Sequence, residues 1–304
     1  MGIFRGILMG SKRQMGWGTL VLLASVLGYS SCSKSSKTDS EHELGPTLDF
    51  FQADCEASQT SGIVNGQKVF NFDSDSRRSV LLIIQDSSGA QHACSSTLIS
   101  RSVLLTAAHC LKDAAKVEAV FYTDVSCSGG YSRSQDAILA ADTTIHPLYN
   151  GDEPSMSEDA ANPDLGLVHL SKPAPANYPI FKIEQNPESL QSDVYLYGYG
   201  ITGTDKDDSL ILRKTQVSRS DVTFNQNNMI IDQRNKTGIC QGDSGGAGLM
   251  KDGNDLEIAT VNSYVFSKDG NSDDFCNLFS GSVIVHNYMS WMSSTVSSWG
   301  ENLK

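Results

Sequence analysis

Beyond residue 63 the chain consists of short β-type runs separated by turn residues, and this pattern limits the possible folds more than any other feature. The runs are rich in Val, Ile, Leu, Thr and Tyr, and Gly, Asn, Asp and Ser separate them. They span residues 79–85, 96–107, 117–122, 194–199, 256–266 and 282–285. Many short strands without long helices between them indicate an all-β barrel or sandwich.

One long helix is expected, at the end of the chain. Apolar residues recur there at helical spacing, at Tyr288, Trp291, Met292, Val296 and Trp299. We expect a helix over about residues 287–300 that packs on the strands.

The composition excludes one large class of partner. The chain has 35 acidic and 23 basic side chains and a net charge of −12. Such a surface repels phosphate groups, so no nucleic-acid partner is expected.

Residues 1–32 have the pattern of a signal peptide. A basic stretch precedes an apolar run at 17–29, which is too short to span a bilayer. The run ends in small residues before Cys32 and resembles the lipobox of bacterial lipoproteins, whose cysteine is diacylated. Tyr29 stands where a Leu is usual, so ordinary cleavage without lipid is the alternative. We expect an exported chain: an outer-membrane lipoprotein, periplasmic or secreted.

Residues 33–62 are polar and lack either hydrophobic period, which is typical of a pro-segment or tether. Six cysteines remain after Cys32, an even number in an exported chain, so disulfides are expected. They are Cys55, Cys94, Cys110, Cys127, Cys240 and Cys276. A zinc site is the weaker alternative, because the chain has no CxxC pair and no HExxH motif. We expect no metal and no cofactor.

Three segments carry groups suited to nucleophilic catalysis. The run LLTAAHC at 104–110 ends with His109, whose imidazole can accept and return a proton near neutral pH. The run QGDSGG at 241–246 places the Ser244 hydroxyl among glycines, which allow a tight turn and the close approach of a substrate. In PDLGLVHL at 163–170, Asp164 precedes an apolar strand. Each segment alone is also compatible with a structural role.

Together the three segments resemble the chymotrypsin-like (trypsin-fold, S1) serine peptidases, with His, Asp and Ser in that family's chain order. Further landmarks are IVNG at 63–66, IHPLYN at 145–150, GYG at 198–200 and YMSW at 288–291. The resemblance implies a peptidase domain over 63–304, built from two antiparallel six-stranded β-barrels with a C-terminal helix. The barrels are expected over about 63–175 and about 176–286.

The resemblance also implies roles for individual residues in peptide-bond hydrolysis. Ser244 is expected to be the nucleophile, His109 its general base, and Asp164 the group that orients the imidazole. The backbone N–H groups of Gly242 and Ser244 are expected to form the oxyanion hole. Protein or peptide substrates follow as partners. The alternative is a catalytically silent lipoprotein of this fold that acts as a binding or adhesion module, against which the complete set of groups argues.

In this family, cleavage before the Ile frees an α-amino group that pairs with the Asp preceding the nucleophile. Here these are Ile63 and Asp243. Ser61 and Gly62 precede the bond, so we expect an activating protease that tolerates small residues, or self-activation.

By resemblance, Cys94 pairs with Cys110 and Cys240 pairs with Cys276. A bridge between Cys55 and Cys127 would keep the pro-segment attached after cleavage, although these positions do not match the family's own.

The resemblance also places the specificity pocket. Gly238 is expected at its floor, without a carboxylate for Arg or Lys substrates. Ser263, Tyr264 and Val265 are expected along the substrate backbone, with Val265 narrowing the pocket. We expect a preference for small to medium aliphatic P1 residues, with an aromatic preference as the alternative.

Overall fold

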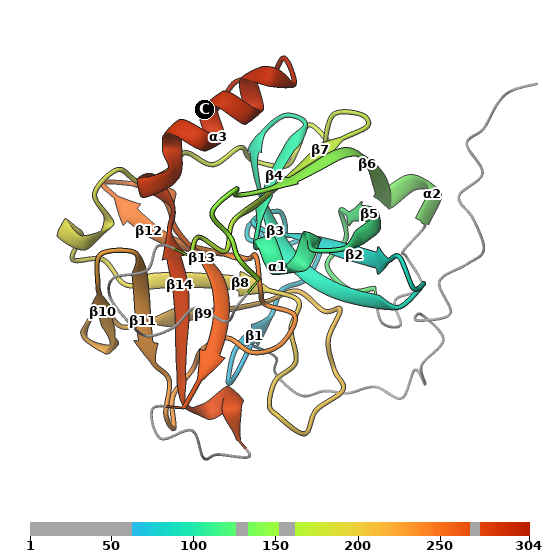
Figure 1. The fold of residues 1–304 in the computed structure, drawn as a ribbon. Coiled ribbons are helices and arrows are strands. Elements are labelled where there is room, and N and C mark those ends of the chain that lie inside the picture. Colours follow the sequence, from blue (N-terminus) through green and yellow to red (C-terminus); the bar gives the residue numbers. More distant parts are fainter. Residues whose placement is uncertain (1–62, 126–132, 152–161, 268–273) are drawn as a thin grey trace, which may run out of the picture. The chain divides into compact units, whose positions relative to one another are not determined.

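The computed structural model describes residues 63–125, 133–151, 162–267 and 274–304, which form two groups of antiparallel strands (Figure 1). The first group closes into a barrel in the order β2-β3-β4-β7-β6-β5, and the second is an eight-stranded sheet in the order β1-β9-β8-β12-β13-β14-β11-β10. The expected segments 1–32 and 33–62, with Cys32 and Cys55, lie outside the described residues, as does Cys127.

The first barrel is built largely from continuous apolar runs. Its strands and short helices are β2 (Val80–Asp86), β3 (Gln91–Ser100), β4 (Val103–Thr106), α1 (Ala108–Leu111), β5 (Ala114–Val120), α2 (Arg133–Asp136), β6 (Ala137–Ile145) and β7 (Gly166–Leu170). The first five residues of β2, VLLII, are all buried, as expected for a strand whose two faces are both covered.

The run at 96–107, expected as one strand, is two. β3 ends at Ser100, β4 begins at Val103, and Thr97 pairs with Leu105 across the hairpin. Nearly every residue around the turn is buried, so the apolar pattern continues through it. Hydrophobic periodicity therefore gives no signal for the break.

The second group has six strands of five or more residues and a short strand at each end. Its strands are β1 (Gln67–Lys68), β8 (Val194–Gly198), β9 (Arg213–Val217), β10 (Val222–Phe224), β11 (Asn228–Asp232), β12 (Ala247–Asp252), β13 (Asp255–Phe266) and β14 (Phe279–Ile284). Short 3₁₀ turns span Pro187–Ser189, Arg219–Asp221, Phe275–Asn277 and Val285–Tyr288. The expected fold class, all-β with two barrel-like groups, is confirmed, although the ladder of the second group does not close.

The chain's first described residues belong to the second group, although the expected first barrel began at residue 63. β1 pairs with β9, with Gln67 opposite Lys214. Ile63 is completely buried in the apolar cluster of the second sheet. The N-terminal end is therefore anchored beside the sheet that carries the Ser244 segment.

Backbone hydrogen bonds join the two groups directly. The Leu212 amide donates to the Thr123 carbonyl at 2.6 Å, and the Ser95 amide donates to the Ser244 carbonyl at 2.8 Å. Because these bonds fix the main chain on both sides, side chains from the two groups can be held in register with one another.

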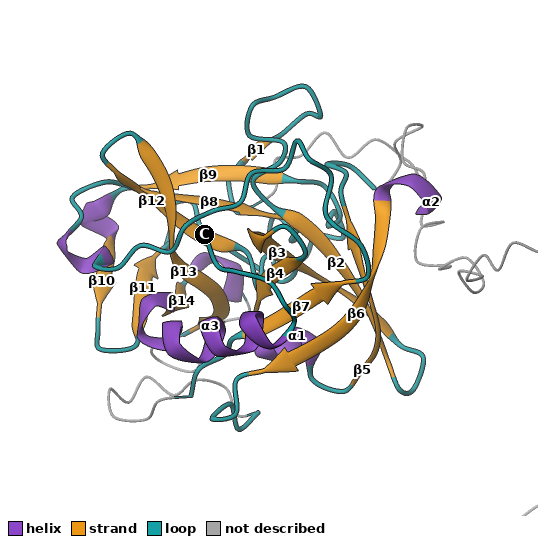
Figure 2. Ribbon diagram, turned by 90° about the horizontal axis from the view of Figure 1, so that it is seen from above, coloured by secondary structure: helices purple, strands orange, loops and turns teal. Residues whose placement is uncertain are grey.

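The expected C-terminal helix is present as α3 (Met289–Ser298), following the last 3₁₀ turn (Figure 2). Its buried residues Met292 and Val296 join the main apolar core. Beyond it, the Trp299 indole donates to Asp142 at 3.0 Å and stacks on His169 of β7. These contacts hold the helix against the first barrel. Within the described ranges, no helix has both the length and the apolar character needed to cross a membrane.

Candidate active site

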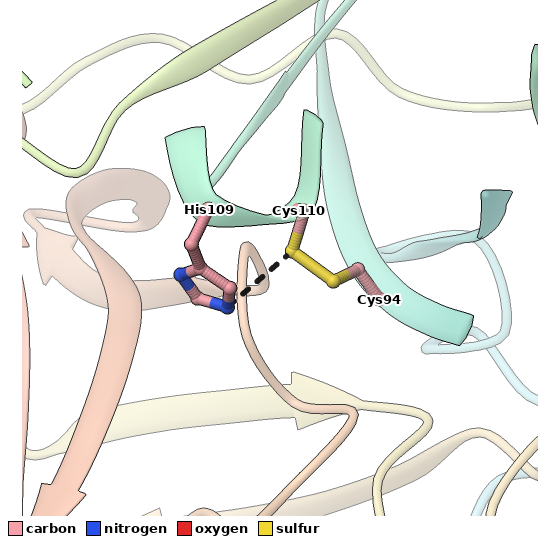
Figure 3. A group of neighbouring side chains, drawn as sticks. All are labelled: Cys94, His109 and Cys110. Carbon is pink, nitrogen blue, oxygen red and sulfur yellow. Dashed lines mark hydrogen bonds between the residues drawn. A yellow bond between two sulfur atoms is a disulfide. The ribbon is translucent and has the colours of Figure 1, made fainter. Parts of the chain in front are cut away.

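The short helix α1 presents His109 directly after β4. Its neighbour Cys110 forms a disulfide with Cys94 of β3 (Figure 3). A helix of four residues has little stability of its own. The covalent tie to β3 therefore helps to fix the position of His109.

Cys94, His109 and Cys110 lie close enough together to suggest a metal site. Both sulfur atoms are in the disulfide, whereas zinc binds thiolates. The 3.7 Å contact between His109 Nε2 and Cys110 Sγ in Figure 3 is thus a contact with a disulfide sulfur. This cluster does not offer the ligands of a metal site.

Asp164 is buried two residues before β7 and accepts three hydrogen bonds. His109 donates to it twice, from the backbone N–H at 2.8 Å and from ring Nδ1 at 2.7 Å. The Ser263 hydroxyl of β13 is the third donor, at 2.5 Å. Since Nδ1 carries the donated proton, the neutral imidazole has a free lone pair on Nε2.

Ser244 lies in a tight loop before β12. The Asp243 amide donates to the Cys240 carbonyl at 3.1 Å, and the Gly246 amide donates to the Asp243 carbonyl at 3.0 Å. The Ser244 hydroxyl donates to the Ser263 carbonyl at 3.5 Å, and its contact with His109 Nε2 is not formed in this rotamer. Catalytic hydrogen bonds are often long or unformed before a substrate binds.

The two peptide groups that contain the N–H of Gly242 and the N–H of Ser244 have fixed orientations. The Gln241 carbonyl accepts from the Ile201 amide at 2.9 Å. Since a trans peptide points its N–H away from its C=O, the Gly242 N–H faces the opposite side, and the Asp243 carbonyl fixes the Ser244 N–H in the same way. Gly242 has φ 92°, and a Cβ there would lie 2.8 Å from the Gly200 Cα, so the turn requires glycine.

The carboxylate of Asp243 is completely enclosed. It accepts from the Gly200 amide and from the Cys240 amide, each at 2.9 Å. A Cβ added at Gly198 or Gly200 would collide with this side chain, so both glycines are needed for its enclosure. Burial raises the pKa of Asp243 to about 7, although the two backbone hydrogen bonds oppose that shift.

A cavity of about 340 Å³ brings the candidate residues together. It is lined by His109, Tyr149, Gly151, Asp164, Ile239, Cys240, Gln241, Ser244, Ser263, Tyr264 and Val265. The structure therefore places the three residues of the expected triad, and the three residues expected along the substrate, around one cavity.

Gly238, the expected floor of the pocket, is not among the lining residues. It is buried, and a Cβ there would collide with the side-chain amide of Gln233. That amide donates to the carbonyls of Ile239 and Cys276. Gly238 therefore packs against a buried amide outside the cavity lining, which the motif spacing alone did not reveal.

Comparisons with known proteins identify the family and the fold. The family model described as Trypsin matches residues 69–292, well over half of the chain. The chain belongs to the trypsin family. A solved structure of an HL collagenase is similar in fold, with 20% sequence identity and a TM-score of 0.58 over 77% of this chain and 99% of that chain.

Both disulfides that resemblance to the trypsin family implied are present, between Cys94 and Cys110 and between Cys240 and Cys276. The second ties the Ser244 loop to the 3₁₀ turn before β14. The expected bridge between Cys55 and Cys127 falls outside the described residues.

Sequence reasoning missed two residues that support the loop carrying Ser244. The Ser95 hydroxyl of β3 accepts from the Tyr199 amide at 3.0 Å and donates to the Gly242 carbonyl at 2.9 Å. A serine followed by two more hydroxyl residues in a strand gives no signal of such a role. Its position is visible only when both strand groups are in place.

The second is Arg213, which is 1% exposed. Its guanidinium donates to the Gly200 carbonyl at 3.3 Å and lies 3.7 Å from Asp208. Because the Gly200 amide bonds to Asp243 and the Gly200 carbonyl bonds to Arg213, the two side chains fix the successive peptides on either side of the Gly200 Cα. In the sequence it begins the polar run RKTQV, which indicates a solvent-facing strand rather than a buried cation.

We expect the contribution of Asp243 to the free energy of unfolding of the uncut chain to fall as the pH rises from about 4 to about 7. Burial raises the folded-state pKa of Asp243 to about 7, whereas the pKa of an Asp in an unfolded chain is about 3.9. Between these values the folded chain binds a proton that the unfolded chain releases, so this stabilisation is complete below the unfolded pKa and is lost through the folded pKa.

The measurement is denaturant unfolding at several pH values for an uncut Ser244→Ala chain with and without Asp243→Asn. The asparagine chain should lack this part of the slope, whatever its absolute stability. Identical slopes in the two chains would contradict a titrating carboxylate at this position.

Proposed function

We propose that this chain is a serine endopeptidase that hydrolyses peptide bonds through an acyl-enzyme on Ser244. The supporting observation is the carboxylate of Asp164, which orients the His109 imidazole while Ser244 lines the same cavity. A base held by a buried carboxylate beside a serine hydroxyl is the arrangement that nucleophilic catalysis requires.

Attack begins with rotation of the Ser244 hydroxyl from the Ser263 carbonyl toward His109 Nε2. His109 takes the hydroxyl proton as Oγ bonds to the substrate carbonyl carbon, and returns it to the leaving amine. Asp164 stabilises the imidazolium that forms between these steps. Water then attacks the acyl-enzyme, with the same imidazole removing its proton, to release the acid and restore Ser244.

The oxyanion of each tetrahedral intermediate accepts from the N–H groups of Gly242 and Ser244. Support for this role comes from the fixed carbonyls of Gln241 and Asp243, which orient those peptides. Donors placed before the reaction cost no reorganisation in the transition state, and in related sites one donor contributes about 3–4 kcal/mol.

Cleavage before Ile63 activates this enzyme in our proposal. Ile63 is buried and has φ 47°, a conformation that a β-branched side chain tolerates poorly. The angle φ is defined only while the bond to residue 62 exists, so cleavage removes this constraint. The freed ammonium would neutralise the Asp243 carboxylate, whose burial alone disfavours ionisation. The cut is made by a protease that tolerates small residues, or by the enzyme itself.

Small to medium aliphatic P1 residues fit the cavity best. Val265 lines it, and the Tyr264 ring lies over Gly281, where an added Cβ would collide with the ring. The ring therefore fills space that a large P1 side chain would need. Burial raises the pKa of the Tyr264 phenol to about 12, so it stays neutral at physiological pH.

The N-terminal pattern adds a location to this proposal. Export, and lipid attachment at Cys32, would place the peptidase in an oxidising compartment, which suits the two disulfides among the described residues. The polar stretch at 33–62 would then act as tether and pro-segment.

We expect a fluorophosphonate to label Ser244 only after cleavage before Ile63. The uncut chain is compared with a chain that carries an engineered protease site ending at residue 62, before and after cutting. The Ser244→Ala chain, cut in the same way, is the control for labelling elsewhere. The readout is intact mass together with the modified peptide.

If the cut chain is folded but is labelled no more than the Ser244→Ala control, the result contradicts the peptidase. It then favours the binding or adhesion module. Equal labelling of the cut and uncut chains would keep the peptidase but contradict activation at Ile63.

Removing bulk at the cavity wall should broaden P1 specificity. We expect Val265→Gly and Tyr264→Ala each to raise kcat/KM for Phe relative to Ala at P1 by about 10-fold or more, since a change in pocket volume alters discrimination by roughly 10–200-fold. Matched peptide substrates measure the ratio, and Phe224→Ala on β10 serves as the control. An unchanged ratio in both cavity variants would show that these side chains do not limit P1.

A further inference from the structure

Three carboxylates gather at the far end of β13 from the proposed active site. Each of Glu184, Asp252 and Glu257 offers an oxygen, and these oxygens lie within 4.8 Å of one another. Asp252 ends β12 and Glu257 is the third residue of β13, so the two are diagonal neighbours across the hairpin. Glu184 joins them because its amide donates to the Ile258 carbonyl at 2.9 Å.

The burial of Glu184 makes this cluster unlike an ordinary acidic surface. The residue is only 6% exposed. One carboxylate oxygen accepts from the Asn186 amide at 2.8 Å, whereas Oε2 is buried and has no hydrogen-bond partner within the part of the chain that the structure describes. A buried carboxylate oxygen without a donor is costly, so the position calls for a bound proton or a cation.

The nearby basic groups do not meet that need. The Lys182 ammonium lies 3.6 Å from Glu257, and its side chain is half exposed. The Lys251 ammonium lies over the ring of Tyr195 instead. One loosely held ammonium against three carboxylates leaves a net negative site, so mutual repulsion favours a divalent ion.

The donor set identifies the class of ion. All three ligands are oxygens, which suit hard cations and not zinc or copper. Calcium binds oxygens at about 2.3–2.6 Å, so ligands on opposite sides of the ion lie up to about 5 Å apart, and three oxygens that lie within 4.8 Å of one another can share one calcium ion. Magnesium at about 2.0–2.1 Å requires a tighter octahedron. Asp252 is exposed, which leaves room for water ligands.

We propose that Glu184, Asp252 and Glu257 form a calcium site that fastens the segment between the two strand groups to the β12–β13 hairpin. That segment is bonded on one side to the first barrel, where the Phe181 amide donates to the Leu98 carbonyl at 3.0 Å. On the other side, Lys182 and Glu184 bond to Ile258 of β13. A cation here resists separation of the two groups.

The site acts on stability and not on the chemical step. Ser263 lies six residues along β13 from Glu257, which is about 20 Å at the rise of an extended strand. The proposal is therefore independent of the proposed peptidase activity, and it is tested in the uncut Ser244→Ala chain, which cannot digest itself.

The experiment compares thermal unfolding in about 10 mM calcium chloride, the same concentration of magnesium chloride, and a chelator, with calorimetric titration of calcium alone. Binding to the folded state alone stabilises it by mass action, so we expect calcium to raise the Tm by several degrees, more than magnesium does. Glu257→Gln and Asp252→Asn should abolish most of the rise. Asp255→Asn, in the same hairpin but outside the cluster, should retain it.

The Tm values measured in the chelator give a second test. Without calcium, Glu257→Gln should have a Tm equal to or above that of the parent chain, because it removes a repelling charge. If the parent chain shows no calcium-dependent rise and no binding heat, the proposal is wrong. It is equally wrong if Glu257→Gln and Asp252→Asn respond to calcium as fully as Asp255→Asn does. Glu184→Gln is a further variant, and a failure of that buried variant to fold would not affect the other two.

Discussion

The hydrogen bonds to Asp164 are the contacts on which the candidate site depends. One carboxylate, just before β7, accepts hydrogen bonds from the His109 ring and backbone of α1 and from the Ser263 hydroxyl of β13. It therefore joins the first barrel to the second sheet beside the cavity that it lines. Because the carboxylate is buried, its charge is poorly screened, and losing a donor would leave it uncompensated.

A second buried carboxylate determines the shape of the loop that carries Ser244. Asp243 holds the Gly200 and Cys240 amides, while Arg213 bonds to the Gly200 carbonyl. Burial disfavours the ionised form of Asp243 although the Arg213 charge opposes that effect, so the proposed ammonium at Ile63 would add the charge needed to keep this carboxylate ionised. The same enclosure requires glycine at positions 198 and 200.

The fold class could be predicted from the sequence, because the order of the motifs, the GYG and IVNG landmarks and the terminal helix are all local patterns. The sequence also located the residues that line the cavity at His109, Asp164, Ser244 and Val265. It could not show that residues 96–107 turn back on themselves, since buried strands leave no polar interruption. Ser95, Arg213 and Gln233 were missed because their roles depend on residues outside their own strand or turn, such as Cys276 for Gln233. Glu184 likewise reaches Asp252 and Glu257 only because its segment bonds to β13 in the folded chain, and no motif predicts that contact.

In the proposed function, His109 and Ser244 come together from the two strand groups and act as one catalytic unit. The most direct test is the kcat for peptide hydrolysis of the cut chain carrying His109→Ala, Ser244→Ala, or both. Groups that act as a unit are strongly non-additive, so each single change should lower kcat by at least about 10⁴-fold and the double change should cost no more than either. Losses that multiply in the double variant, or substantial hydrolysis by Ser244→Ala, would contradict the claim.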